Sequence, residues 1–552
     1  MSGDNSSAAR GGASRFNLGE LFDLVADAAP ERTAVIWGDE RVRYGELRER
    51  SDRFAAFMRR AGIRRGDTVG IMMQNSPVFL QALIACWKLG AISFTINYRY
   101  VASELVYLLK DAEASAIIQD EDYVAIVDTV LPEIKPLKLR MAVEAPERPA
   151  LERADIVSYK KAMVEPVGDT DIRGGRSDDD LLLIYTGGTT GMPKGVEWEH
   201  RALFFSALGG GGADHPDGPI TAPEQLGKRV IAGRGRTLLG TGPLMHGAAV
   251  YMAFNTLYGG STLVLMRSPS FDAELVWTLI EREKVNSVTI MGDAMMGPMI
   301  RAWDAHPGRW DISSLLMIGS GGGALSIHNS AAAKERLPKI QVFNGLGSSE
   351  SGAIGAGGMD TGGDGFLLIK PRADLGVIID GERLAKPGEM GIFARTGHIS
   401  KAYWRDPVKT AQTYVTLDGE RWILTGDRAK LEPNGEMRIY GRDSTSINTG
   451  GEKVFAEEVE GAIRSHPDVT DAVVIGMPHE RWGQAVVAVL SLKQDAALDL
   501  ETLRTFCSDK LARYKLPQAM FVTDVVQRSP AGKADLRWAK AVAEGAQAKA
   551  AD

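Results

Sequence analysis

The stretch Tyr185-Thr-Gly-Gly-Thr-Thr-Gly-Met-Pro-Lys194-Gly195 decides how the chain is interpreted. Its glycines let backbone N–H groups approach an anion closely, and its hydroxyls and its ammonium group supply further donors to phosphate oxygens. The apolar residues 181–184 directly before it predict a buried strand. A strand followed by a loop of glycine and threonine predicts a phosphate-binding cradle.

This loop differs from the Walker A loop, in which a lysine follows glycine and precedes serine or threonine. Here Pro193 precedes Lys194, and Gly195 follows it. An ordinary glycine-rich loop without a ligand is the alternative interpretation of the segment taken alone.

The bulk composition is that of a soluble globular protein with several domains. The 552 residues are enough for two to four domains, and the net charge of −7 gives no reason to expect nucleic-acid binding. The two cysteines, Cys86 and Cys507, have no metal or redox spacing, so we expect packed thiols in a reducing cytoplasm. The eight histidines lack paired spacing, which argues against a zinc site.

The sequence contains no apolar run of the roughly 18 residues that a membrane span needs. Residues 1–15 are rich in serine, glycine and alanine and lack an apolar core, so they predict a disordered tail and not a signal peptide. We therefore expect a cytoplasmic location, while peripheral contact with a membrane stays open.

Helix and strand patterns alternate through the first 170 residues. One apolar face predicts a helix over residues 44–60. Ser76 and Pro77 are typical of a helix start and Gly90 of a helix end, which predicts a second helix over 78–89. We also expect strands over 68–73 and 115–119 and a helix over 103–110. This alternation of helices and strands predicts an α/β architecture.

Short apolar segments over 262–266, 287–291 and 315–318 predict further strands, each followed by a glycine-rich or polar loop. Ligand sites in open α/β sheets lie at such strand ends. The glycine-rich segments 209–235 and 352–365 show little periodicity and predict long loops.

A domain boundary is predicted near residue 440, because a new α/β pattern begins after it. The expected elements are helices over 457–464 and 500–511 and strands over 471–475 and 485–492. About 110 residues are enough for a small domain. We therefore expect a tail over 1–15, a large domain over 16–440 and a small domain over 441–552.

Further motifs follow the first loop in a fixed order. They are Pro243-Leu-Met-His246, Gly319-Ser-Gly-Gly-Gly-Ala324, Leu346-Gly-Ser-Ser-Glu350, Thr425-Gly-Asp427, Gly441-Arg442, Asn448-Thr-Gly-Gly-Glu-Lys-Val454 and Gly532-Lys533. In their order and spacing, over about residues 18–540, the chain resembles the acyl-activating (adenylate-forming) superfamily. The wording of the motifs at 185–196 and 447–454 is most similar to actinobacterial fatty-acyl and steroid-side-chain CoA ligases.

The resemblance implies an α/β fold: a large N-terminal acyl-activating domain of layered α/β subdomains and a small, mobile α+β C-terminal domain. It also implies a two-step reaction. A hydrophobic carboxylic acid attacks the α-phosphate of ATP, which gives acyl-AMP and pyrophosphate, and the thiol of CoA then displaces AMP. Mg²⁺ is the implied metal, since the first step brings two anions together. A homodimer stays open.

The resemblance assigns nucleotide or CoA contacts motif by motif. The implied binding residues are Thr186, Gly187, Gly188, Thr189, Thr190, Gly191, Lys194, Gly322, Gly323, Ala324, Leu346, Gly347, Ser348, Ser349, Asp427, Arg442, Gly450, Gly451 and Lys533. Among these, residues 186–194 would hold the β- and γ-phosphates, Asp427 the ribose hydroxyls, and Arg442 the ribose or a phosphate. Gly450 and Gly451 would line the pantetheine tunnel after a domain rotation.

Four residues have implied catalytic roles: Lys533, His246, Thr186 and Glu350. Lys533 would bridge the carboxylate and the α-phosphate, and His246 would lie beside the acyl carboxylate. Glu350 would bind Mg²⁺, as would Thr189. For each, an ordinary structural role as a turn residue, a solvated side chain or an ion pair is the alternative.

The chain departs from the family pattern in places. Leu346 stands where relatives have a tyrosine that stacks on adenine, and Ser349 replaces a threonine. Asn448 replaces a lysine of many luciferase-like members, as in other CoA ligases of this subgroup. The expected hinge falls near Ser444, where relatives more often carry aspartate or lysine.

Four methionines, Met291, Met295, Met296 and Met299, predict either an adaptable apolar pocket or core packing. No acidic residue is placed to receive an amino group, so a hydrophobic acid is preferred over an amino acid. The alternatives are a fatty-acyl-AMP ligase that loads an acyl carrier protein and a catalytically silent ligand-binding homologue. A luciferase-type oxygenase is the least favoured.

Overall fold

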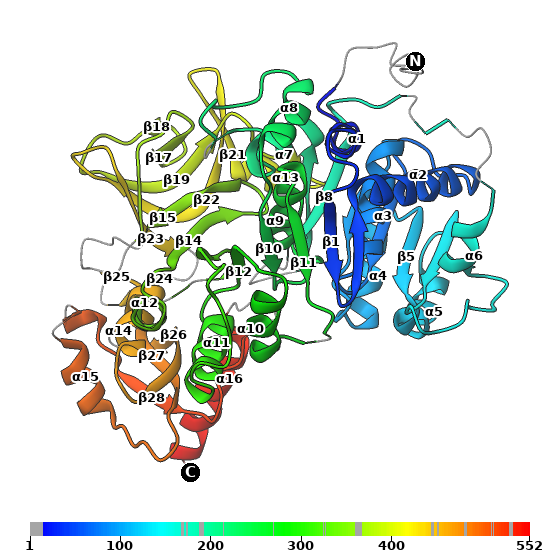
Figure 1. Cartoon of the computed structure of the whole chain (residues 1–552). Helices are drawn as coiled ribbons and strands as arrows, with labels where there is room; N and C mark the ends of the chain where they lie inside the picture. Colours follow the sequence, from blue (N-terminus) through cyan, green and yellow to red (C-terminus); the bar gives the residue numbers. More distant parts are fainter. Residues whose placement is uncertain are drawn as a thin grey trace. The chain divides into compact units, whose positions relative to one another are not determined.

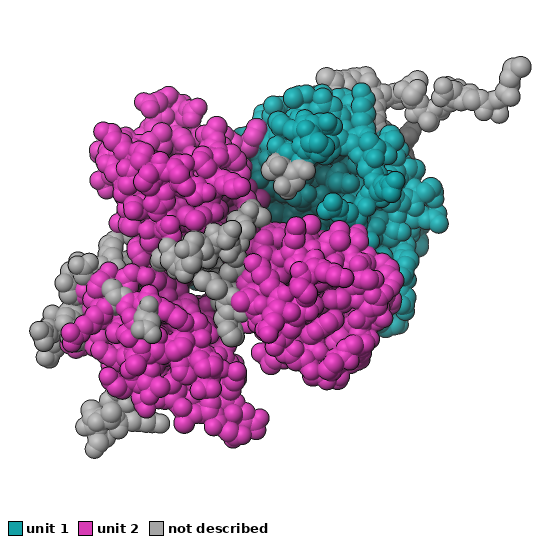
Figure 2. Space-filling model, turned by 60° about the vertical axis from the view of Figure 1, so that its left-hand side comes forward, with its two compact units in different colours: residues 1–269, 400–407 teal, residues 270–399, 408–552 magenta. Residues whose placement is uncertain are grey.

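The structure is a computed structural model of the whole chain. It describes residues 15–551 except 167–170, 173–174, 187–191, 213–214, 269, 324, 326, 359–366, 443–445, 450–451, 480–482, 509, 512 and 529–533. The chain forms two compact units, residues 1–269 with 400–407, and residues 270–399 with 408–552 (Figure 2). The predicted boundary near residue 440 stays a prediction.

The first unit contains a sheet in the strand order β20-β9-β8-β4-β3-β5-β6-β7, of which Figure 1 labels β8 and β5. Six strands run parallel: β3 (Thr68–Met72), β4 (Ile92–Thr95), β5 (Ala116–Asp120), β6 (Leu139–Val143), β7 (Val157–Ser158) and β8 (Leu181–Thr186). The antiparallel strands β9 (Lys194–Glu199) and β20 (Ala402–Tyr403) extend the β8 side. The carboxyl ends of the parallel strands therefore share one edge.

Helices of this unit are α1 (Leu18–Ala28), α2 (Tyr44–Arg60), α3 (Pro77–Leu89), α4 (Ala102–Asp111), α5 (Val124–Val130), α6 (Tyr159–Val164), α7 (His200–Ala207), α8 (Glu224–Ala232) and α9 (Gly247–Tyr258). The predicted caps of α3 are confirmed. Ser76 accepts a hydrogen bond from the N–H of Phe79, and Gly90 ends the helix with φ +67°.

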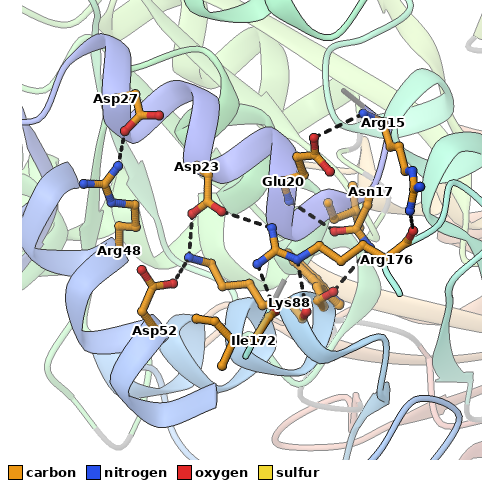
Figure 3. A network of polar contacts seen from close by, with 12 residues as sticks. Arg15, Asn17, Glu20, Asp23, Asp27, Arg48, Asp52, Lys88, Ile172 and Arg176 are labelled. Carbon is orange, nitrogen blue, oxygen red and sulfur yellow. Dashed lines mark hydrogen bonds and ion pairs between the residues drawn. The ribbon is translucent and has the colours of Figure 1, made fainter. Parts of the chain in front are cut away.

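A network of buried charges joins α1, α2 and α3 (Figure 3). Lys88 on α3 is fully buried and contacts the carboxylates of Asp23 and Asp52. Arg176 adds ion pairing to Asp23 at 3.1 Å and donates to the carbonyl of Lys88. Burial acts to raise the pKa of Asp23, but Lys88 and Arg176 together hold it below its ordinary value.

The first unit also holds the strand set β10-β11-β1-β2, with β10 (Thr237–Gly240), β11 (Thr262–Leu265) and β1 (Thr33–Trp37) parallel and β2 (Glu40–Arg43) antiparallel. Tyr44, at the start of α2, donates to the carbonyl oxygens of Leu257 and Ser261 at 2.8 and 2.7 Å. These bonds tie α2 to the end of α9.

The second unit begins with parallel strands β12 (Ser287–Ile290), β13 (Met317–Ser320) and β14 (Gln341–Ser348), followed by antiparallel β15 (Gly352–Gly358). Helices α10 (Ala273–Arg282), α11 (Asp293–Ala305) and α12 (Ile327–Arg336) alternate with them. A second sheet follows the order β16-β23-β22-β19-β17-β18, and β21 pairs with β22. Its strands are β16 (Leu367–Ile369), β17 (Leu375–Ile379), β18 (Arg383–Leu384), β19 (Met390–Thr396), β21 (Tyr414–Leu417), β22 (Glu420–Leu431) and β23 (Met437–Arg442), and α13 spans Pro407–Thr413.

The chain ends in a smaller α+β layer (Figure 1). This layer has its own buried core. Its sheet order is β25-β24-β27-β26, and β28 pairs with β27. The elements are β24 (Ser446–Thr449), β25 (Glu452–Phe455), α14 (Ala456–Arg464), β26 (Val469–His479), β27 (Gly483–Leu492), α15 (Leu500–Ser508), β28 (Ala519–Val522) and α16 (Leu536–Ala551).

Both predicted long loops contain regular structure, so those predictions are wrong in part. Residues Gly352–Gly358 form β15, because their backbone pairs with β14 although they offer few side chains to show a pattern. Helix α8 lies within the predicted loop 209–235, where it buries Leu226 and Val230.

Candidate active site

The Thr/Gly loop joins two antiparallel strands. Thr186 at the end of β8 and Lys194 at the start of β9 are register partners, and residues 187–191 between them lie outside the described part of the chain. The predicted cradle therefore lies between two antiparallel strands, and a strand, not a helix, follows it. Phosphate binding at this loop would depend on backbone N–H groups and side chains, without a helix N-terminus.

Lys194 forms an ion pair with the carboxylate of Asp406. The side chains are 42% and 27% exposed, so the pair lies open to solvent and to a ligand. Next to it, Tyr185 donates to the carboxylate of Asp111 at 2.7 Å. Burial raises the pKa of Asp111, while Tyr185, Arg405 and Lys194 act to lower it. The sequence motifs did not predict Asp406, because it lies 212 residues from Lys194 along the chain.

His246 lies at the N-cap of α9 and is half-buried, with its Nε2 atom shielded from solvent. Asn75 both donates to and accepts from the backbone of the preceding loop, at 3.0 and 2.7 Å. Thr95, the last residue of β4, donates to the carbonyl of Met245 at 2.8 Å. Since β4 and β8 are neighbours, these bonds bring His246 to the sheet edge that carries Thr186 and Lys194.

The glycine motif after β13 is held in place by buried polar groups. Ser320 is 1% exposed; its hydroxyl accepts from the N–H of Gly292 at 3.0 Å and donates to the carbonyl of Gly323 at 2.9 Å. The Asn344 side chain accepts from and donates to the backbone of Leu325, at 3.3 and 3.0 Å. Gly322 has φ +81°, which favours glycine there. Ala324 lies outside the described residues.

Glu350 lies in the turn that joins β14 to β15, half-buried. The hydroxyl of Ser348 accepts from the N–H groups of Glu350 and Ser351, at 3.2 and 3.0 Å. Buried Arg395 donates to the carbonyls of Ser351 and Ala353, at 2.6 and 3.0 Å. Arg395 therefore fixes the turn that presents Glu350, a role with no sequence signal because a lone arginine in a strand is common.

The other residues of this motif lie on or beside β14. Leu346 is partly buried and packs against a core cluster that includes Ile354 and Ile369. Gly347 admits no side chain, because a Cβ would lie 2.4 Å from the carbonyl oxygen of Gly352. Ser349 follows the strand, half-buried.

Asp427 lies on β22 and is the register partner of Arg442 on β23. The N–H of Asp427 donates to the hydroxyl of Thr425 at 3.2 Å, and that hydroxyl donates to the carbonyl of Phe393. The structure thus brings together two residues that the sequence predicted separately as nucleotide contacts.

Several predicted residues cannot be placed. Gly187, Gly188, Thr189, Thr190, Gly191, Ala324, Ser444, Gly450, Gly451 and Lys533 lie outside the described residues. The predicted metal site is compatible with the placed residues, because Mg²⁺ is usually bound by one or two carboxylates together with substrate phosphates. Among the described residues, no group of three or more histidine, cysteine or acidic side chains could hold a metal by itself.

The four predicted pocket methionines are all buried. Met295, Met296 and Met299 lie on α11, and Met291 precedes it. Trp277 donates to the carbonyl of Met299 at 2.9 Å. Core packing and a closed apolar pocket both bury such residues, so both interpretations stand.

Two family models match the chain, and together they span most of the motifs described above. The family of AMP-binding enzymes matches residues 22–404, and the C-terminal domain of AMP-binding enzymes matches residues 458–533. The chain belongs to the AMP-binding enzyme family. The predicted superfamily is thereby confirmed, and the match includes the placed residues Thr186, Lys194 and Glu350.

Relatives in this family cover nearly the whole chain. The medium-chain acyl-CoA ligase Mig of Mycobacterium avium is 38% identical over 95% of this chain and 98% of its own. A medium/long-chain fatty-acid–CoA and 3-oxocholest-4-en-26-oate–CoA ligase of Mycolicibacterium smegmatis is 36% identical over 96% of this chain and 97% of its own. The predicted enzyme class agrees with both names.

The fold has solved counterparts. The crystal structure of the anthranilate CoA ligase AuaEII in complex with anthranoyl-AMP matches with a TM-score of 0.82 and 22% identity, over 97% of this chain and 98% of its own. This likeness confirms the predicted α/β fold of a large N-terminal and a small C-terminal domain. Among the described residues, no helix is both long and apolar enough to cross a membrane.

Proposed function

We propose that this chain is an AMP-forming acyl-CoA ligase that activates a hydrophobic carboxylic acid. The observation that carries the proposal is the match to named acyl-CoA ligases at 36–38% identity over at least 95% of the chain. Three placed residues support it, because ligands bind at strand ends in α/β sheets. Lys194 begins β9, the Glu350 turn follows β14, and the residue before His246 is hydrogen-bonded to the last residue of β4.

The reaction has two steps. A carboxylate oxygen of the acid attacks the α-phosphorus of ATP, and the bond to the β-phosphate breaks to release pyrophosphate. The sulfur of CoA then attacks the acyl carbon, AMP leaves, and the thiol proton passes to solvent. Positive charge near the phosphates lowers the barrier of the first step, because it offsets the repulsion between two anions.

The site residues take distinct parts in this proposal. Lys194 would bind the phosphates of ATP in exchange for Asp406, and Asp427 would accept hydrogen bonds from the ribose. Glu350 would hold a Mg²⁺ ion that neutralises phosphate charge. Lys533 is proposed to meet the α-phosphate and the carboxylate.

The acid is proposed to be a fatty acid or a steroid-side-chain acid. The relatives are named for such acids, and the buried methionines of α11 and its preceding loop are suited to an apolar group. A cytoplasmic location, a homodimer and peripheral contact with a membrane remain predictions.

Turnover of a panel of acids tests the proposal. Purified protein is given ATP, Mg²⁺, CoA and linear, branched, aromatic or steroidal acids, and pyrophosphate and thioesters are measured by mass spectrometry. We expect thioesters of lipophilic acids. Acyl-AMP without a CoA thioester would favour carrier-protein loading, and absence of pyrophosphate with every acid would contradict adenylation altogether.

The Lys533→Ala variant separates the two steps. We expect pyrophosphate release to fall by about 10²–10³, the effect of removing one preorganised charge. Thioester formation from supplied acyl-AMP should survive. Equal loss of both steps would contradict the proposed role of Lys533.

A further inference from the structure

A cluster of charged residues lies where α14 meets β26. Arg464, the last residue of α14, ion-pairs with Glu460 one turn earlier and with Asp471 at 3.5 Å. Arg528 donates to both carboxylate oxygens of Asp471, from Nε at 2.6 Å and from Nη2 at 2.8 Å. The four side chains are at most 23% exposed.

A fifth charge reaches this cluster from outside the small α+β layer. Asp293, the first residue of α11, lies with its Oδ2 atom 3.6 Å from Nη1 of Arg464. The two side chains are only 12% and 11% exposed. This ion pair therefore joins the predicted C-terminal domain to a helix of the predicted large domain.

The charges of the cluster balance without Asp293. Burial raises the pKa of Glu460, and the neighbouring charge of Arg464 acts to lower it. With Glu460 and Asp471 ionised, their two negative charges match the two positive charges of Arg464 and Arg528. Burial acts to lower the pKa of Arg528, but Asp471 and then Glu460 and Asp293 raise it above its ordinary value. A cluster that is neutral by itself keeps its internal partners when Asp293 leaves, so the contact suits a surface that docks and separates.

Both sides of this contact connect to predicted reaction elements, the Arg464 side through Asp471 and Arg528. Arg528 pairs with Ala534 in an antiparallel bridge, and these two residues flank the sequence segment that contains Lys533. Asp293 follows Gly292, whose N–H is held by Ser320, the residue that also holds the carbonyl of Gly323. Through Asp471, the ion pair thus connects Arg528, next to the Lys533 segment in sequence, with the glycine loop predicted to contact the nucleotide.

We propose that the Arg464–Asp293 ion pair is a docking contact that positions the C-terminal domain for acyl-AMP formation and is not used in thioester formation. The inference rests on the proposed function. Arg464 and Asp293 are positioning residues in this account, because they act through the placement of other groups.

Separate measurement of the two steps in the full-length Asp293→Asn variant tests the contact. Pyrophosphate release reports the first step, and thioester formation from purified acyl-AMP and CoA reports the second. We expect the first rate to fall about tenfold, the second to stay within twofold, and Asp293→Glu to restore most of the first. Thermal unfolding reports whether the fold is kept.

Lys515→Met is the matched control. It breaks the ion pair between Lys515 and Glu458 of the same helix α14, and this pair is about as buried as the Arg464–Asp293 pair. Both rates should stay within twofold in that variant. Equal loss of both steps in Asp293→Asn, loss of the second step alone, or an unchanged first step would overturn the docking role. If instead the unsubstituted protein releases no pyrophosphate with any acid, the proposed function itself has failed.

Discussion

Two lysines of the first unit have the same kind of partner and opposite surroundings. Lys88 is fully buried between Asp23 and Asp52, and Arg176 braces the same network (Figure 3). Lys194 has one carboxylate partner, Asp406, and keeps 42% of its side chain exposed. The first lysine is enclosed by protein groups, whereas the second can exchange its partner.

The difference shows that burial decides whether a charged side chain can exchange its partner without loss of stability. A buried ion pair cannot be broken without leaving an uncompensated charge in a medium of low dielectric. An exposed pair contributes little to stability, since solvent and salt screen it. The proposed exchange of Asp406 for a phosphate at Lys194 would therefore cost the fold little.

The largest expected effect is on the buried lysine. Lys88→Met removes the cation between Asp23 and Asp52, so we expect the free energy of unfolding to fall by about 3–5 kcal/mol. Urea denaturation measures this change. The control is Lys138→Met, which breaks a pair to Asp67 whose lysine side chain is 46% exposed and should cost about 1 kcal/mol or less. Equal losses in the two variants would remove the distinction between the lysines.

The exposed lysine should show the reverse pattern. Lys194→Ala should lower the rate of pyrophosphate release by about 10²–10³, because one preorganised charge at the phosphates is lost. The free energy of unfolding should stay within about 0.5 kcal/mol. Kinetics and urea denaturation on the same preparation check both. A folded variant that keeps its full rate would exclude Lys194 from the site.

Asp120, a half-buried carboxyl at the end of β5, extends the comparison to the same edge of the sheet. Burial raises the pKa of Asp120 to about 7, and the charges of Asp122 and Glu121 add to the effect. The folded protein then binds a proton that the unfolded chain has lost, so stability falls as the pH rises from about 4 to about 7. Asp120→Asn should remove this loss. Relative to the unsubstituted chain, its free energy of unfolding should be about 2 kcal/mol higher at pH 8 than at pH 4, a value reduced for the partial exposure of Asp120.

Unfolding of both proteins at a series of pH values measures that gain. A difference between Asp120→Asn and the unsubstituted chain that does not change with pH would contradict the assigned protonation. A difference that grows only below pH 4 would also contradict it, since the raised pKa places the titration above that value.

The smallest expected effect concerns the partner of Lys194. Asp406→Asn removes the carboxylate that competes with phosphate, so ATP should bind about two- to fivefold more tightly, in line with the strength of an exposed ion pair. Calorimetry at low salt measures the affinity. Asp178→Asn, which breaks an equally exposed pair to Arg201 away from the loop, is the control. Weaker ATP binding in Asp406→Asn would mean that the carboxylate positions Lys194 and does not compete.

Local patterns predicted the elements whose side chains repeat. Helix α2 matches its predicted range, and the caps of α3 at Ser76 and Gly90 are where the sequence places them. Strand β15 was missed, because a run of glycines has no periodicity and is ordered by its pairing with β14. Helix α8 was missed within a segment whose glycines and prolines dominate the pattern.

The candidate site divides in the same way. The motif residues Lys194, His246 and Glu350 could be predicted, since each belongs to a short sequence pattern. Asp406 and Arg395 could not, because their roles come from contacts between distant parts of the chain. Supporting residues of this kind follow from the fold and not from a local sequence.

The most direct test of the central claim follows the oxygens of the acid. A lipophilic acid labelled with oxygen-18 at both carboxylate positions is converted with ATP and CoA, and AMP and the thioester are analysed by mass spectrometry. An acyl-adenylate route predicts one labelled oxygen in AMP and one in the thioester carbonyl. Unlabelled AMP, or label found in pyrophosphate or inorganic phosphate, would contradict it.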